Sequence, residues 1–192
     1  MRPTVISLVS SHRLTSQSTA LSWPTLTVQW FPDVKEPEGK NTRIHRVLLG
    51  THTSDEMPNY VQIAEVEIPK SVRPNARDYD EERGEIGGHG KGDTPAMKWN
   101  IVQKIDHPGE VNKARYCPQN PDLIATLSVD GRILIFDRTK HSSEPNGKVN
   151  PQIELKGHDN EGFGLNWNPH VEGSLASGSE DQTVCLWYVA DL

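Results

Sequence analysis

The sequence predicts an all-β chain that forms an open, partial β-propeller of about three blades. Two observations lead to this fold class. Residues 106–137 and 157–188 match each other without a gap at an offset of 51 residues, which indicates an internal repeat. Turn residues such as Asp130-Gly131 and Asn168-Pro169 divide both copies into short apolar runs that are typical of strands. Four short strands in roughly 40–50 residues are typical of one propeller blade.

Residues 1–19 precede the first predicted strand and are rich in Ser and Thr, with no Asp or Glu. Arginines in such a stretch are also found in mitochondrial targeting segments, but Arg2 and Arg13 are few and the apolar spacing is irregular. We therefore interpret residues 1–19 as a disordered or atypical leader. No apolar run in the chain is long enough for a transmembrane helix.

Residues 20–106 are predicted to form a divergent first blade that lacks the polar pattern of the repeat. Its expected strands are residues 23–30, 44–51, 60–68 and 99–105. Residues 70–98 lie between the last two strands and form a long acidic loop, which we expect to be mobile. Gly90-Lys91 in this loop resembles part of a phosphate-binding loop, but the Gly and Ser/Thr that such a loop requires are missing at the correct spacing.

The two copies of the repeat are predicted to form a second blade, residues 107–156, and an incomplete third blade, residues 157–192. The expected strands are residues 111–116, 123–127, 132–137 and 152–156 in the second blade, and 162–167, 174–178 and 183–188 in the third.

Polar residues recur at fixed positions in both copies, and each copy ends with an aromatic residue. The matched positions are His107 and His158, Thr126 and Ser177, Asp130 and Asp181, and Phe136 and Trp187. Gly157-His158, residues 175–179, Asp181 and Leu186-Trp187 resemble the WD-repeat pattern. His, Ser and Asp also occur in hydrolase triads, but a catalytic triad is not expected twice at one spacing.

The WD-repeat resemblance implies a structural role for these polar residues, because buried polar groups need hydrogen-bond partners. We expect His158, Ser177, Asp181 and Trp187 to form a hydrogen-bonded tetrad that ties the strands of the third blade together. His107, Thr126 and Asp130 are expected to form a less complete copy, because Phe136 has no N–H to donate.

Five longer stretches resemble one WD-repeat subfamily, the histone-binding chaperones that include retinoblastoma-associated histone-binding proteins and the second subunit of type B histone acetyltransferase. These stretches are residues 20–30, 45–54, 109–116, 118–121, and 157–158 with 161–165. The resemblance runs from about residue 20 to residue 189 and is nearest to fungal members. It implies a propeller that closes with seven blades, of which this chain holds about three.

The histone tails bound by this family are extended and rich in Lys and Arg, so a receptor needs carboxylates that converge on one face. Glu110 and Glu161 occupy the same position in the repeat, three residues after the blade His, and are expected at matching points on one propeller face. The resemblance implies that Glu110, Asn112, Glu161 and Phe163 face the tail-binding mouth of the central channel. His52 is a further candidate for the lining of this mouth. A Glu near a strand start can equally be a solvated surface residue.

The resemblance implies a non-enzymatic histone-binding scaffold without a cofactor or metal. Its expected partners are histones three and four and the subunits of acetyltransferase, deacetylase, chromatin-assembly or Polycomb-type complexes, in the nucleus and cytoplasm. The chain has 26 Asp and Glu against 20 Lys and Arg, which suits a basic partner and argues against direct nucleic-acid binding. An alternative is a WD-repeat adaptor for a non-histone partner, such as a ubiquitin-ligase substrate receptor. An enzyme is a weaker third hypothesis, since no metal cluster, nucleotide loop or nucleophile–base pair stands out.

Three features depart from the resembling family. Ser22 stands where many relatives carry Glu, which removes one carboxylate from the mouth. Residues 1–19 show no acidic, aromatic helix of the kind that grips histone four in relatives. About three blades form a partial ring with two open edges, so the isolated chain is expected to be marginally stable and to self-associate or aggregate.

Overall fold

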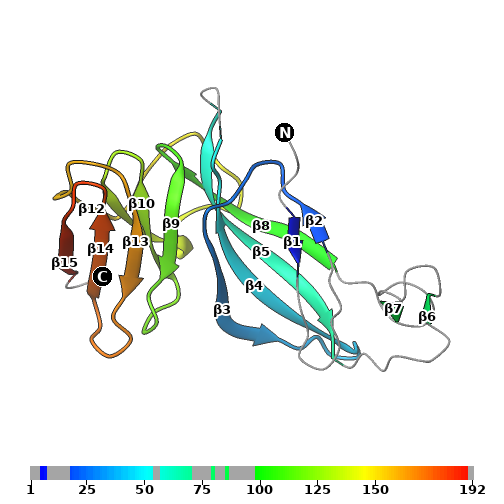
Figure 1. Ribbon diagram of the computed structural model, residues 1–192. Helices are drawn as coiled ribbons and strands as arrows, with labels where there is room; N and C mark the ends of the chain where they lie inside the picture. The colour runs from blue at the N-terminus through cyan, green and yellow to red at the C-terminus, as the bar shows by residue number, and fades with distance from the viewer. Residues whose placement is uncertain are drawn as a thin grey trace.

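The computed structural model describes residues 5–7, 18–53, 57–70, 79–80, 85–86 and 98–189, with side chains from 20–53, 57–70 and 98–189. In these residues the chain is nearly all β-structure, and its one helix is a single 3-10 turn, η2 (Arg138–Lys140). Three antiparallel sheets follow one another along the chain and stand side by side without closing into a ring (Figure 1). The prediction of an all-β, open partial propeller is confirmed.

The first sheet contains β3 (Val28–Lys35), β4 (Thr42–Gly50), β5 (Asn59–Pro69) and β8 (Lys98–His107), paired in that order. β3 begins five residues later than expected and continues beyond Trp30. Before it, the Thr25 hydroxyl accepts a hydrogen bond from the Gly50 N–H, so a side chain takes the place of the ladder. Pro32 fits within β3 because β3 is an edge strand, and its register against β4 shifts between Trp30 and Val34.

The second sheet has the order β12-β11-β10-β9, and the third has the order β13-β14-β15. Their strands lie within one residue of the predicted bounds. They are β9 (Val111–Tyr116), β10 (Leu123–Ser128), β11 (Ile133–Asp137), β12 (Ile153–Leu155), β13 (Gly162–Trp167), β14 (Ser174–Ser179) and β15 (Val184–Tyr188). In both sheets the first strand, β9 or β13, is the inner edge that faces the neighbouring sheets.

Two small strand pairs lie in stretches for which no strands were expected. β1 (Val5–Ser7) pairs with β2 (Ser18–Ala20) at the amino terminus, and β6 (Tyr79–Asp80) pairs with β7 (Glu85–Ile86) in the acidic loop. β-Branched residues in Val5-Ile6-Ser7 favour an extended strand. The other residues of the predicted leader and most of the acidic loop lie outside the described residues.

Apolar side chains fill the two spaces between the sheets. Phe31, Leu48, Val61 and Phe136 belong to the core between the first and second sheets. The core between the second and third sheets contains Ile133, Leu165, Trp167 and Leu175, among others. Every residue of β10 is buried because both faces of the second sheet are covered. The second sheet is therefore the centre of the described molecule.

Side-chain hydrogen bonds also join the inner strands of neighbouring sheets. Thr27 Oγ1 lies 3.0 Å from both the N–H and the carbonyl oxygen of Ala114 in β9, so this hydroxyl satisfies two groups at a free strand edge. The Gln29 side-chain oxygen accepts a hydrogen bond from the Tyr116 N–H at 3.0 Å. On the other side of β9, Trp167 Nε1 donates to the Arg115 carbonyl oxygen at 2.9 Å. These bonds fix the position of each inner strand along the length of its neighbour.

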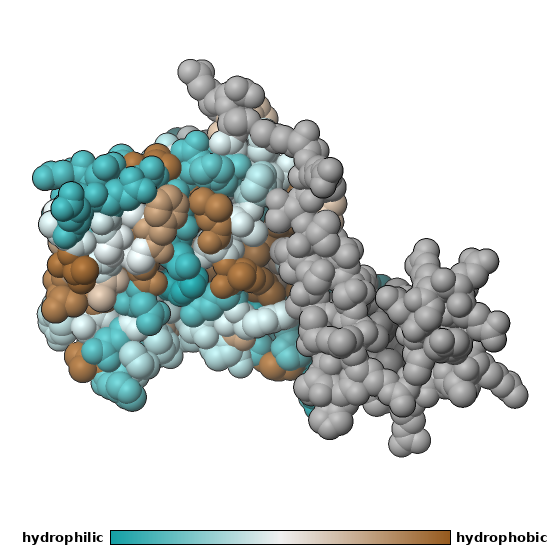
Figure 2. Space-filling view, viewed as in Figure 1, coloured by the Kyte–Doolittle hydropathy of each residue, from teal (hydrophilic) through white to brown (hydrophobic). Residues whose placement is uncertain are grey.

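The third sheet has one uncovered face. Val184, Leu186 and Tyr188 alternate along β15 and point away from the core, and Leu186 is 82% exposed. The intervening residues Cys185 and Trp187 are partly buried on the inner face. Figure 2 shows apolar surface at this side of the molecule, over β15.

Candidate functional site

The candidate site lies where the inner strands β9 and β13 begin. Glu110 directly precedes β9, and Glu161 directly precedes β13. Asn112 and Phe163 are the second residues of the same two strands. Because β9 and β13 are neighbours, the 51-residue repeat brings these four equivalent positions to the same end of adjacent strands (Figure 1).

A direct contact between the two blades links Asn112 with Glu161. The Asn112 side-chain amide donates a hydrogen bond to Glu161 Oε2 at 2.9 Å. Asn112 is only 1% exposed, whereas Glu161 remains partly exposed. In the free protein, Asn112 therefore orients the Glu161 carboxylate and does not itself present a surface, which differs from its expected place in the lining of the mouth.

The backbone of Glu161 is also held in place. Its carbonyl oxygen accepts hydrogen bonds from the Glu180 N–H and from the Ser179 hydroxyl, both at 2.8 Å. Its N–H donates to the side-chain oxygen of Asn160 at 2.9 Å. Ser179 is a contributor that the sequence did not single out for this site, although its repeat position matches Ser128. The carboxylate thus extends from a fixed main chain.

The remaining candidates are Phe163, Glu110 and His52. Phe163 is 45% exposed, and Glu110 is partly buried. His52 has an exposed side chain, and its N–H donates to the Pro24 carbonyl oxygen. The neighbouring Thr51 carbonyl oxygen accepts a hydrogen bond from the Val111 N–H at 3.0 Å, which places the His52 segment beside the start of β9.

Two buried polar atoms at the start of β9 and the end of β10 have no hydrogen-bond partner among the described residues. They are the side-chain oxygen of Asn112 and the hydroxyl of Ser128. Ser128 pairs with Val111 in the ladder, one residue before Asn112. Two polar groups beside the start of β9 therefore retain unused hydrogen-bonding capacity.

In the third sheet the structure brings together the four residues expected as a structural tetrad. His158 Nε2 lies 2.7 Å from Ser177 Oγ, and Trp187 Nε1 donates to the same oxygen at 2.8 Å. His158 Nδ1 lies 3.0 Å from Asp181 Oδ2. Since a carboxylate can only accept, Nδ1 donates to Asp181, and in the neutral ring Nε2 then accepts from the Ser177 hydroxyl.

The Asp181 carboxylate receives several further hydrogen bonds. The Thr183 hydroxyl donates to it at 2.6 Å, and the backbone N–H groups of Asp159 and Thr183 donate at 3.0 and 2.8 Å. These donors, led by the Thr183 hydroxyl and joined by His158, hold the pKa of Asp181 well below its usual range. Thr183 was not identified from the sequence, although a Thr two residues after an Asp is typical of such a turn.

The corresponding residues of the second sheet are arranged differently. His107 Nε2 lies 2.9 Å from Thr126 Oγ1, as in the third sheet, but Nδ1 donates to the Gly109 carbonyl oxygen at 2.6 Å. Asp130 instead binds the Arg132 guanidinium at 2.6 Å on the surface. The Gly109 carbonyl oxygen therefore takes the place expected for the Asp130 carboxylate. A main-chain acceptor of this kind leaves no pattern in the sequence.

Burial changes the ionisation of His107. Desolvation lowers its pKa from 6.5 to about 4, although the Gly109 carbonyl oxygen favours the protonated ring. His107 is therefore neutral at pH 7 and serves as a hydrogen-bonded core residue. Its partner Thr126 is fully buried beside the ring.

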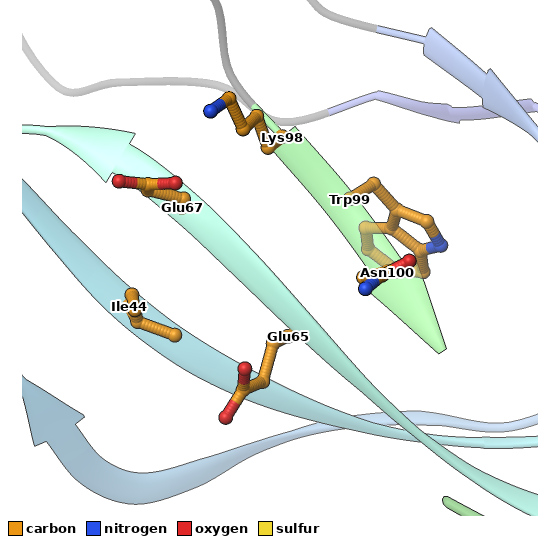
Figure 3. A pocket seen from close by; sticks show the side chains of 6 residues that line it. All are labelled: Ile44, Glu65, Glu67, Lys98, Trp99 and Asn100. Carbon is orange, nitrogen blue, oxygen red and sulfur yellow. The ribbon is translucent and has the colours of Figure 1, made fainter. Parts of the chain in front are cut away.

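A separate cleft of about 450 Å³ lies along β4, β5 and β8, away from the inner strands. Figure 3 shows its lining side chains, Ile44, Glu65, Glu67, Lys98, Trp99 and Asn100. Its carboxylates already have partners: Lys35 Nζ is 3.0 Å from Glu65, and the Thr42 hydroxyl donates to Glu67 at 2.7 Å. This cleft was not anticipated from the sequence, because its residues come together only through the strand register.

Two further features concern the described residues. No helix among them is long and apolar enough to cross a membrane. No group of three or more His, Cys, Asp or Glu side chains in the same residues is arranged to hold a metal ion.

Comparison with known families yields a match over residues 15–70. The matching family is described as the histone-binding protein RBBP4 or a subunit of the CAF1 complex, with binding of histone H4 in the name of the family. This segment includes β3, β4 and β5, the first three strands of the first sheet.

Curated fungal proteins extend the similarity over most of the chain. "Histone acetyltransferase type B subunit 2" of Gibberella zeae is 76% identical over 172 residues. These matches confirm the predicted family. The proteins of the same name from Neurospora crassa and Aspergillus fumigatus are 69% and 61% identical. Each match covers 88% of this chain.

The chain spans about 40% of the length of these fungal relatives. Among solved structures, a chain of a mitotic checkpoint complex aligns with 87% of this chain and 36% of its own length. That alignment has 16% sequence identity and a TM-score of 0.48.

Proposed function

We propose that this chain is part of a non-enzymatic histone-binding scaffold, and that the starts of β9 and β13 receive a basic histone tail. The observation that carries the proposal is the hydrogen bond from Asn112 to Glu161. This bond orients the carboxylate of Glu161, the residue that occupies the same repeat position as Glu110. A receptor oriented before binding loses less conformational freedom when the ligand arrives.

The chemistry of the two carboxylates suits arginine and lysine. An arginine guanidinium binds a carboxylate through two parallel hydrogen bonds, and such charge-assisted bonds strengthen when the pair is partly desolvated. Glu110 and Glu161 are both partly buried, so they meet this condition better than fully solvated acids. Phe163 adds an exposed aromatic ring that can cover the aliphatic part of a basic side chain. We include His52 in the lining of the mouth because the neighbouring Thr51 carbonyl oxygen bonds to the first residue of β9.

The names of the relatives support a place in chromatin complexes. The matching family is described as histone-binding or as part of a CAF1 complex, and the fungal relatives are named as acetyltransferase subunits. We therefore propose histones three and four and an acetyltransferase complex as partners, with catalysis carried out by another subunit. Chromatin-assembly, deacetylase and Polycomb-type complexes, and a cytoplasmic as well as a nuclear location, are further parts of the proposal.

The proposal is tested by binding of a fluorescent, unmodified histone-three tail peptide to the purified chain, followed by anisotropy. Glu110→Gln combined with Glu161→Gln keeps the shape of both side chains but removes their charge. We expect binding to weaken by about tenfold or more, because two charge-assisted contacts are lost.

The matched control is Glu154→Gln combined with Glu172→Gln, which removes the same charge from exposed positions outside the site. This control should leave peptide binding within about twofold of the unaltered chain. Thermal unfolding of both double variants checks that the fold is intact. Equal tail binding by the site variant and the control would contradict the proposal and favour an adaptor for another partner.

A further inference from the structure

A second hollow, of about 530 Å³, lies under the connection between β11 and β12, where this connection packs against β8. Three lysines from separate segments line it: Lys104 of β8, Lys140 of η2 and Lys148 of the connection. We refer to this hollow as the basic rim pocket. It belongs to the outer strands of the first two sheets, whereas the proposed histone site belongs to the inner strands.

The lining of the basic rim pocket carries more positive than negative side chains, although the whole chain has a net charge of −6. Lys104 and Lys148 form no salt bridge with a carboxylate of the described residues, and the Lys104 ammonium lies 6.0 Å from the centre of the Tyr60 ring. Lys140 pairs with Asp137 at 3.3 Å but is 62% exposed, so this pair contributes little.

One of the two acidic residues that line the pocket is already engaged. Asp106 Oδ2 accepts hydrogen bonds from the backbone N–H groups of Asn146 and Gly147, at 2.9 and 3.0 Å. This carboxylate anchors the connection and does not neutralise a lysine through a salt bridge within the described part of the chain. Glu144 is the other acidic residue of the lining, against the three lysines.

The pocket is also held in shape. The Gln103 side-chain amide nitrogen lies 2.9, 3.1 and 3.3 Å from the carbonyl oxygens of Arg138, His141 and Ser142. The Lys104 N–H donates to the Ser143 carbonyl oxygen at 2.9 Å. Because the connection is fixed to β8 at several points, the hollow exists before a ligand binds.

We propose that the basic rim pocket binds a short acidic peptide segment, rich in Asp and Glu, of a partner protein. Converging lysines attract carboxylates, and the size of the hollow suits a few side chains. A phosphate group is a poorer ligand, because the Asn146 and Gly147 N–H groups that would cradle it already bind Asp106. Long nucleic acids are disfavoured by the negative charge of the rest of the chain.

This inference does not depend on histone binding, since it involves different residues and a ligand of opposite charge. Its test is the anisotropy of a fluorescein-labelled hexaglutamate peptide titrated with the full 192-residue chain at low salt. Lys104→Gln combined with Lys148→Gln is expected to weaken binding by about tenfold. Raising the salt concentration should weaken binding to the unaltered chain as well.

The matched control is Lys35→Gln combined with Lys156→Gln, which removes two exposed lysines elsewhere on the surface. If the peptide binds this control and the pocket variant equally well, the attraction is general and the proposal is wrong. Inorganic phosphate or a DNA oligonucleotide that binds more tightly than the peptide and competes with it would also overturn the proposed ligand class. Circular dichroism of both variants identifies a loss of binding that comes from unfolding.

Discussion

The second and third sheets carry the same repeat but satisfy their buried histidines in different ways. In the third sheet, His158 binds Asp181 and Ser177, and Trp187 completes the network. In the second sheet, the ring of His107 finds a backbone carbonyl, and the fully buried Phe136 replaces the indole. The second sheet is covered on both faces, whereas the third is open on one. Apolar packing can therefore replace polar links where both faces are covered.

The largest expected effect comes from the apolar side of this comparison. Phe136→Ala should lower the free energy of unfolding by about 3–5 kcal/mol, because a fully buried aromatic side chain leaves a cavity between the first and second sheets. Trp187→Ala in the half-covered third sheet should cost less. Urea denaturation of both variants measures the difference. A larger loss of stability for Trp187→Ala would contradict the view that apolar packing in the second sheet contributes more than the Trp187 network in the third.

Acid should act on the second sheet through His107. The pKa of this ring falls from 6.5 to about 4 on folding, so the unfolded chain binds a proton more readily between these values. Stability is therefore lost as pH falls from about 6.5 towards 4, by up to about 3 kcal/mol. A His107→Gln variant should show a flatter profile over this range. An identical pH dependence in the variant would show that His107 is not responsible.

Matched hydroxyl removals compare the polar networks directly. Ser177→Ala leaves His158 Nε2 and Trp187 Nε1 without a partner, and should cost about 2–3 kcal/mol. Thr126→Val keeps the side-chain shape and removes mainly the contact with His107, so it should cost about 1–2 kcal/mol. Thermal unfolding followed by circular dichroism measures both. Equal losses would mean that the indole link adds nothing.

The smallest expected effect is at Asp130. Asp130→Ala removes a surface pair with Arg132 and should change stability by at most about 0.5–1 kcal/mol. Asp181→Ala should lower the melting temperature by clearly more, because His158, Thr183 and the Asp159 N–H all lose an acceptor. A loss at Asp130 as large as that at Asp181 would indicate that Asp130 reaches His107 in solution.

Most strand positions could be predicted from the sequence, because apolar periodicity and turn residues act locally. β9, β10 and β13 have nearly the expected bounds for this reason. β3 was misplaced because its start depends on the Thr25 hydroxyl, and its passage through Pro32 depends on its position at the sheet edge. Such features follow from the neighbours of a strand and leave no local signal.

The candidate site was partly predictable in the same sense. The repeat places Glu110 and Glu161 at equivalent strand starts, and the structure puts these strands side by side. The role of Asn112 could not be derived, since its burial and its bond to Glu161 arise only when two blades pack together. The Gly109 carbonyl that replaces Asp130 is a main-chain group, so no residue type indicates it.

The attraction between the two carboxylates and a basic tail is the central feature of the proposed site. Isothermal titration of the chain with an unmodified histone-three tail peptide, and with the same peptide in which Gln replaces Lys and Arg, tests this attraction. We expect the unmodified peptide to bind and the neutral peptide to lose nearly all affinity, with heat that diminishes as salt increases. Equal affinity for both peptides would contradict a receptor built from Glu110 and Glu161.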